Sequence, residues 1–62
     1  MSDSVAVDAK RILLRYGAPI TVLDRMSEGD RIDCARTVSQ TDVSDRNERL
    51  RELLEEKGYV SA

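Results

Sequence analysis

Residues 20–38 read ITVLDRMSEGDRIDCARTV, and the fold of this 62-residue chain depends on whether they form strands or helices. The segment Ile20–Leu23 is rich in β-branched side chains, which are enriched in strands. Residues 27–30 are polar and contain Gly29, so they can close a hairpin as a four-residue loop. The stretch therefore predicts a hairpin of two antiparallel strands.

The second predicted strand contains one anomaly, an arginine on its apolar side. Alternation places four side chains on one face, Ile32, Cys34, Arg36 and Val38. Either the Arg36 guanidinium extends past a short edge strand, or a bulge near Ala35 shifts the register.

A helix is the competing interpretation of the same segment. Residues 28–40 can be helical if Ser27 is the N-cap and Asp30 takes the third helical position. Gly29 would then lie in the first turn, and β-branched residues would lie near the end, both of which disfavour a helix. We therefore expect the hairpin.

Two helices are predicted on either side of this segment. The first follows possible N-caps at residues 2–4, and Gly17 and Pro19 end it. Its apolar face recurs with a period of 3.6 residues, at Val5, Ala9, Ile12, Leu13 and Tyr16.

The last helix begins after Ser44 or Asp45, either of which is a good N-cap, and ends at Gly58. Its apolar stripe is Leu50, Leu53 and Leu54. Ion pairs are expected along its exposed face, Arg49 with Glu52, and Arg51 with Glu48 and Glu55.

The predicted fold class is α+β, a small α-β-β-α domain with two antiparallel helices packed on a two-stranded antiparallel hairpin. Residues 1–62 form a single domain, with an ordered core over about 4–58 and a short C-terminal tail at 59–62. The expected core is Val5, Ala9, Ile12, Leu13, Tyr16, Ile20, Val22, Ile32, Leu50, Leu53 and Leu54.

Composition argues against an enzyme. The chain has 10 basic and 12 acidic residues, a net charge of −2, no His, and Cys34 as its one cysteine. Without a histidine, no Ser, Thr or Cys has an obvious base to activate it, and Cys34 is expected to be a small buried apolar residue. We expect no catalytic residues, no cofactor, no metal site and no membrane segment.

Two pairs of residues are candidate contact sites. Tyr59 and Val60 form an apolar pair on the polar tail, where they can anchor a partner or fold back onto Leu54 as a C-cap contact. Arg46 and Arg49 lie three residues apart and can face DNA phosphates or the carboxylates of a neighbouring copy.

From about Ala9 to Gly58 the chain resembles the W-type head-completion proteins of tailed bacteriophages. The resemblance is carried by a helix that ends in Gly, a strand of the Ile20-Thr21-Val22 type, a Gly-containing turn and a second strand. It is densest over residues 41–58, where Thr41-Asp42-Val43-Ser44-Asp45 leads into a helix with Glu52-Leu53 before Gly58.

This resemblance implies a non-enzymatic head-tail connector. In such a role a ring of copies binds the portal of the DNA-filled head and forms the surface that joins it to the tail. The implied partners are portal or connector proteins and tail components, with DNA contact as an option. The implied location is the head-tail interface of the virion, after assembly in the host cytoplasm.

Two other functions stay open. Residues 45–54 are similar to the second helix of ribbon-helix-helix repressors, whose paired strands enter the DNA major groove. In that case Thr21, Leu23 and Arg25 would contact the bases. A small regulator that binds only protein would share the expected fold and differ only in its partner.

Overall fold

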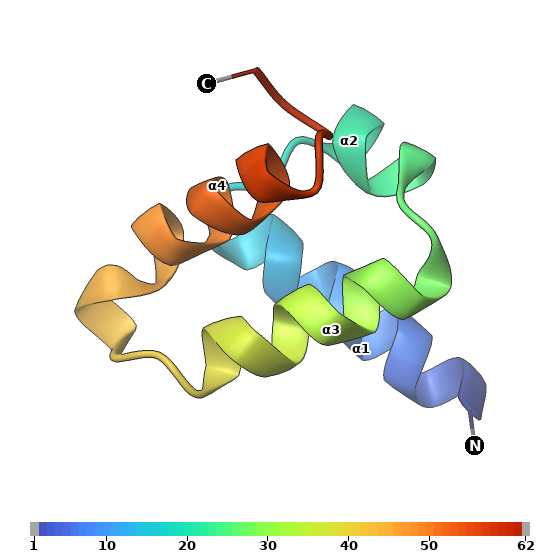
Figure 1. Cartoon of the computed structure of the whole chain (residues 1–62). Helices are drawn as coiled ribbons and strands as arrows, with labels where there is room; N and C mark the ends of the chain where they lie inside the picture. The colour runs from blue at the N-terminus through green and yellow to red at the C-terminus, as the bar shows by residue number, and fades with distance from the viewer. Residues whose placement is uncertain (1, 62) are drawn as a thin grey trace.

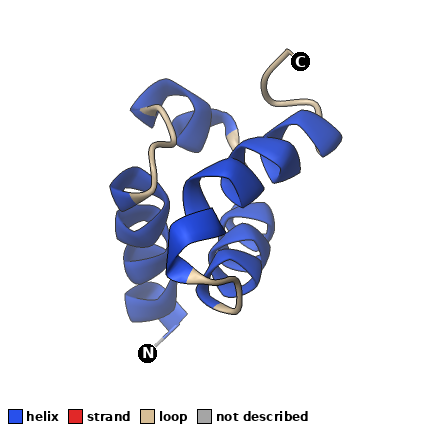
Figure 2. Cartoon of the chain, turned by 90° about the vertical axis from the view of Figure 1, so that its left-hand side faces the viewer, coloured by secondary structure: helices blue, strands red, loops and turns tan. Residues whose placement is uncertain are grey.

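The computed structural model describes the backbone of residues 2–61 and the side chains of residues 8–61. This part of the chain consists of helices joined by short turns (Figures 1 and 2). The elements are α1 (Ser2–Arg15), α2 (Ile20–Arg25), α3 (Glu28–Ser39), the 3₁₀ turn η1 (Val43–Asp45) and α4 (Arg46–Glu56). Helix α1 packs most extensively against α3, and α4 packs on α3.

The predicted hairpin is wrong. Residues 20–25 are helical and residues 28–39 form one continuous helix, so the described chain has no strand and no sheet. The domain is therefore all-α instead of α+β. The ribbon-helix-helix alternative requires a strand at residues 20–25 that enters the DNA major groove. These residues are helical, so that strand is absent.

Burial explains why residues 20–25 are helical despite their β-branched composition. Val22, Leu23 and Met26 are buried, whereas Ile20 is 47% exposed. The buried positions thus recur at offsets of one and four, which is a helical pattern and not strand alternation. Packing against the core overrides a weak local preference.

Helix α2 is only six residues long and is stabilised from outside. A helix this short is unstable on its own, and at its end only the Met26 N–H donates back to the carbonyls of Val22 and Leu23. Arg31 Nη1 donates to the carbonyl oxygens of Leu23, at 2.6 Å, and Met26, at 2.7 Å. A cation at this position also complements the negative end of the helix dipole.

The helical alternative for residues 28–40 is confirmed in its main features. Ser27 is the N-cap of α3, and its Oγ accepts a hydrogen bond from the Asp30 backbone N–H at 3.1 Å. The anomaly at Arg36 disappears, because a helix turns this side chain to solvent while Cys34, Ala35 and Val38 are buried.

Replacing Ser27 by alanine is expected to lower the free energy of unfolding by about 1 kcal/mol, because the N-cap hydrogen bond is lost. Urea denaturation followed by circular dichroism measures this change. Ser44→Ala is the matched control, since the exposed Ser44 does not cap a described helix. Equal effects of the two substitutions would contradict the capping role.

The two glycine stop signals are confirmed. Gly17 has φ +100° and Gly58 has φ +84°, and each lies just past a helix end. Ala18 N–H donates to Leu13 O at 3.0 Å, and Tyr59 N–H donates to Leu54 O at 2.9 Å. These bonds, made just beyond a left-handed glycine, define the Schellman motif.

The start of α4 was predicted only in part. The helix begins at Arg46 after η1, but Asp45, its N-cap, makes no side-chain capping hydrogen bond. The expected pairs of Arg49 with Glu52 (3.3 Å) and Arg51 with Glu55 (3.5 Å) are present.

The core lies where α1, α2, α3 and α4 meet. Six predicted core residues are buried, Ala9, Leu13, Val22, Leu50, Leu53 and Leu54. Ile12, Tyr16 and Ile32 are partly buried against them, Ile20 is exposed, and the Val5 side chain lies outside the described residues. The prediction missed Ala18, Leu23, Met26, Ala35 and Val38, most of which come from the segment assigned to the hairpin.

Candidate functional site

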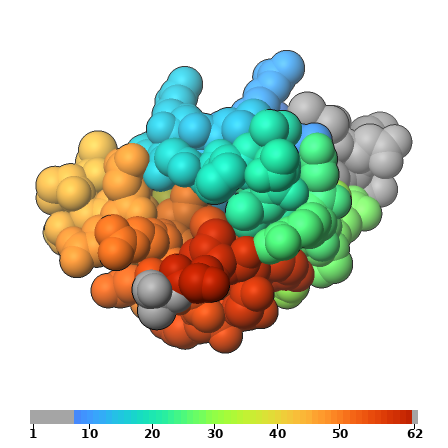
Figure 3. Space-filling view, turned by 90° about the horizontal axis from the view of Figure 1, so that it is seen from above, coloured from blue at the N-terminus to red at the C-terminus, as the bar shows by residue number. Residues whose placement is uncertain are grey.

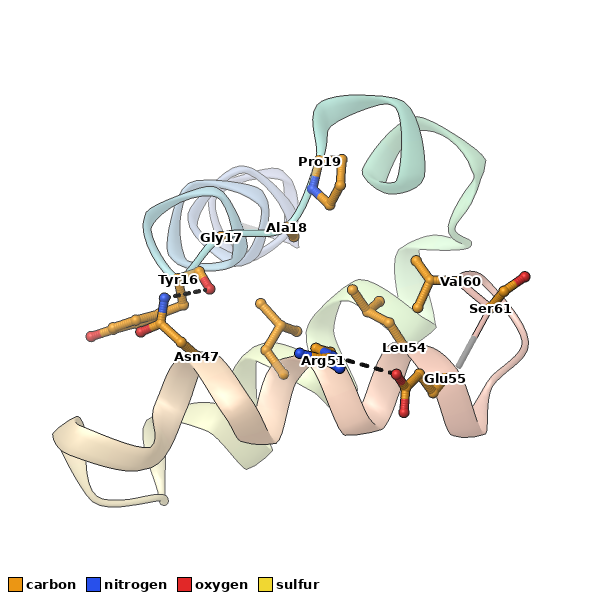
Figure 4. Close-up of a pocket in the computed structure, with 11 residues that line it drawn as sticks. Tyr16, Gly17, Ala18, Pro19, Asn47, Arg51, Leu54, Glu55, Val60 and Ser61 are labelled. Atoms are coloured by element: carbon orange, nitrogen blue, oxygen red, sulfur yellow. Dashed lines mark hydrogen bonds and ion pairs between the residues drawn. The ribbon is translucent and has the colours of Figure 1, made fainter.

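A concave surface lies between the α1–α2 connection and α4, and we call it the α4 groove (Figure 4). Its volume is about 410 Å³. The apolar part of its lining consists of Ala18, Pro19, Leu50, Leu54 and Val60. Pro19 and Val60 lie at one end of the groove in Figure 4, and Tyr16 and Asn47 lie at the other.

The shape of the groove depends on the turn at Gly17. This residue has a left-handed backbone conformation, which lets the chain leave α1 and turn sharply toward α2. A Cβ atom at this position would lie 3.5 Å from Asn47 Nδ2, which is an ordinary contact. A substitution of Gly17 would therefore strain the backbone and not the packing.

Two polar side chains of the groove, Asn47 and Arg51, already have partners within the chain. Asn47 Nδ2 donates to the Tyr16 carbonyl oxygen at 3.0 Å. Arg51 Nε lies 3.5 Å from Glu55 Oε2, which forms an ion pair along the rim. The floor therefore offers mainly aliphatic surface to a ligand.

Arg46, predicted to face DNA or a neighbour, is directed into the domain. Its guanidinium donates to three acceptors, Thr41 O at 2.9 Å, Ser39 O at 3.0 Å and Tyr16 Oη at 2.8 Å. It also lies over the Tyr16 ring, 5.5 Å from the centroid. Arg46 thus joins α1, the end of α3 and α4.

Arg49 does not join Arg46 in a free basic pair. Its Nη1 lies 3.3 Å from Glu52 and 3.5 Å from Glu56, on the exposed side of α4. The two arginines thus have different surroundings, one structural and one in a surface ion pair. A contact of either with a partner stays a prediction.

Tyr59 and Val60 fold back onto the core, as the C-cap alternative expected. Both are partly buried against it. The Tyr59 carbonyl accepts a hydrogen bond from Arg25, and its hydroxyl donates to Asp30. Val60 lines the α4 groove. Of these two residues, only Val60 therefore lies in a groove that a partner can enter.

Tyr59 belongs to a cluster of charged and polar groups at the C-terminal end of α4. Lys57 Nζ lies 3.6 Å from Asp30 and 3.2 Å from Asp33. The hydrogen bond from Tyr59 lowers the pKa of Asp30, and the same bond raises the pKa of Tyr59. The hydrogen bond to Asp33 raises the pKa of Lys57.

These pKa shifts predict how stability depends on pH. Because the pKa of Asp30 is lowered, its contribution is present above its ordinary value of 3.8 and is lost as the pH falls through the folded value. The pKa of Tyr59 is raised, so its contribution is complete below 10 and is lost as the pH rises through the folded value. Urea midpoints measured across the pH range should fall at both ends.

An absorbance titration of tyrosinate isolates the contact. In the native chain Tyr59 should ionise above its ordinary pKa of 10, and Asp30→Asn should bring its pKa back toward that value. Tyr59→Phe assigns the signal. An unchanged Tyr59 titration in Asp30→Asn would contradict the hydrogen bond as its cause.

Cys34 is fully buried, as predicted for a small apolar residue. Burial raises the pKa of its thiol, which disfavours the nucleophilic thiolate. Within the described chain, no group of three or more Cys, Asp or Glu side chains is arranged to hold a metal ion. None of the described helices is both long enough and apolar enough to cross a membrane.

Sequence reasoning missed the groove itself. The sequence predicts Pro19 only as a helix stop, Leu50 only as core, and Leu54 as core and as a C-cap contact. The two sides of the groove are far apart in the sequence, so no local pattern predicts that they meet.

Comparisons of the chain with protein-family models, with curated proteins and with solved structures find no match.

Proposed function

We propose that this chain is a non-enzymatic domain that binds a segment of another protein in the α4 groove. The observation that supports this function is the groove's aliphatic floor, formed by Pro19, Leu50, Leu54 and Val60. The neighbouring Ile20 is 47% exposed, which extends apolar surface beyond the groove. Apolar surface with a polar rim is typical of protein interaction sites.

The engaged polar groups favour a protein segment over a small ligand. Small-molecule sites usually offer a few free polar groups that fix the ligand's orientation. Here Asn47 and Arg51 have partners within the chain. An apolar helix face or loop can instead gain affinity by burying aliphatic side chains against the floor.

Within this class, the head-tail connector is the candidate that the sequence resemblance over residues 41–58 favours. The two strands and the turn that carry the rest of the resemblance are replaced by α2 and α3 in the structure. The resemblance is densest over residues 41–58, which form η1, α4 and the Gly58 turn. Leu50 and Leu54 in this segment also line the groove. The portal or another connector protein would then supply the bound segment, and a protein-binding regulator would use the same groove for a different partner.

Site-specific photo-crosslinking tests this proposal in cells that produce the chain. A photoreactive side chain at Arg51, on the groove rim, should capture one defined partner, which mass spectrometry identifies. The same group at Glu28, exposed at the start of α3, should not capture it. Val60→Asp should abolish capture from position 51 without loss of helicity, because it places a carboxylate in the groove.

The outcomes separate the alternatives. A portal or tail protein captured from position 51 would support the connector role, and a partner outside the virion would contradict that role while supporting protein binding. Equal capture from positions 51 and 28, or capture insensitive to Val60→Asp, would contradict the groove as the binding site.

A further inference from the structure

Three arginines on the outer side of α1 and α3 form a basic patch that is separate from the α4 groove. Arg11, Arg15 and Arg36 are exposed and have no hydrogen-bond or ion-pair partner within residues 8–61. Asp8 lies among them, so the patch has a net charge of +2. Lys10, by contrast, pairs with Asp24 at 3.1 Å and is not part of the patch.

An acidic patch lies at η1 and the start of α4. Asp42, Asp45 and Glu48 are exposed, and no side-chain hydrogen bond or ion pair engages them in the described part of the chain. Arg46 and Arg49 are the basic residues nearest in the sequence, and both are already engaged.

Each patch also presents an exposed aliphatic side chain. Val43, in η1, is 69% exposed next to the acidic residues. Leu14 is 43% exposed and lies three residues from Arg11, on the neighbouring side of α1. Leu14 thus lies beside the basic patch and Val43 beside the acidic patch.

We propose that the acidic patch of one copy docks on the basic patch of a second copy. The two patches are opposite in charge, and each has one exposed aliphatic side chain beside it that the contact can bury. In Figure 3 the blue part of α1 lies along one edge of the molecule and the yellow-orange η1 segment lies along another. The charged side chains of both patches are exposed, so both are open to other copies. The contact does not use the α4 groove.

Sedimentation velocity on the purified chain tests this contact without any other partner. At high protein concentration and about 0.01 M salt, the apparent mass should rise to at least twice the 7.0 kDa of one chain. About 1 M salt, which shortens the Debye length to roughly 3 Å, should return it to that of one chain. A monomer under both conditions would overturn the proposal.

Charge reversal provides the decisive comparison. Arg11→Glu with Arg15→Glu, and separately Asp42→Lys with Glu48→Lys, should each give a monomer at low salt. Mixed in equal amounts, the two double variants should associate again. The native acidic patch of the first variant then meets the native basic patch of the second, and the two reversed patches also meet with opposite signs. Failure of the mixture to associate would overturn the proposal.

A neutral variant covers the case in which lysines at the start of α4 unfold the chain. Asp42→Asn, Asp45→Asn and Glu48→Gln together remove the charge and keep polar side chains near the helix start. This variant should be monomeric at low salt with unchanged helicity. Association equal to that of the native chain would contradict a role of the acidic patch.

Discussion

Replacing Leu53 by aspartate is expected to abolish the cooperative thermal melt of the domain. Leu53 is only 7% exposed and packs in the single described core. Burying a carboxylate there without a partner costs more than about 4 kcal/mol. A domain of this length has a net stability of roughly 3–9 kcal/mol, so most molecules should be unfolded or only partly folded.

Far-UV circular dichroism against temperature measures this effect. The neighbouring Glu52→Gln is the matched control, because it removes only a surface pair with Arg49 and should change stability by less than about 1 kcal/mol. A cooperative melt of Leu53→Asp close to that of the native chain would show that the core is assigned wrongly.

Replacing Arg46 by alanine is expected to lower the free energy of unfolding by about 2–3 kcal/mol. Most of this loss comes from the hydrogen bonds that the charged guanidinium donates. The guanidinium joins Tyr16, just past the end of α1, to Ser39 and Thr41 at the end of α3. Arg46→Lys should recover less than half of the loss, because an ammonium group does not reproduce the planar set of donors.

Urea denaturation measures the effect of Arg46→Ala, and Arg49→Ala provides the control, with a change of less than about 1 kcal/mol. A double-mutant cycle of Arg46→Ala with Tyr16→Phe should show a coupling of at least about 0.5 kcal/mol. Equal effects at positions 46 and 49, or no coupling to Tyr16, would contradict the structural role of Arg46.

The helices at both ends of the chain could be predicted because several local signals agree there. In α1 and α4, an apolar face with a period of 3.6 residues ends at a glycine that the structure places at positive φ. Periodicity and a helix stop are both local, so no tertiary information is needed to find them.

The segment of residues 20–38 was predicted wrongly because its local signals conflict. The β-branched residues at its start favour strands only weakly, and packing against the core reverses that preference. Two features pointed to the helix, the Ser27 cap with Asp30 three residues on, and Arg36 on the face that a strand would bury. Arg36 is the stronger signal, because a helix places this side chain in solvent, whereas a strand needs a bulge to do so.

Of the candidate site, the sequence could predict single residues but not the contacts between distant segments. Val60, one of the two predicted contact residues of the tail, lines the α4 groove, and its contact with a partner stays a prediction. Tyr59 beside it is hydrogen-bonded to Arg25 and Asp30. The structural role of Arg46 could not be predicted, because one of its acceptors, Tyr16 Oη, is 30 residues away in the sequence and the other two are backbone carbonyls.

Backbone carbon chemical shifts of residues 20–40 test the central claim most directly, because the α4 groove and both charged patches depend on the all-α fold. Helical shifts are expected over residues 20–25 and 28–39, with a break at Met26 and Ser27. Two extended stretches separated by a turn at residues 27–30 would contradict the fold, and with it the proposed binding groove.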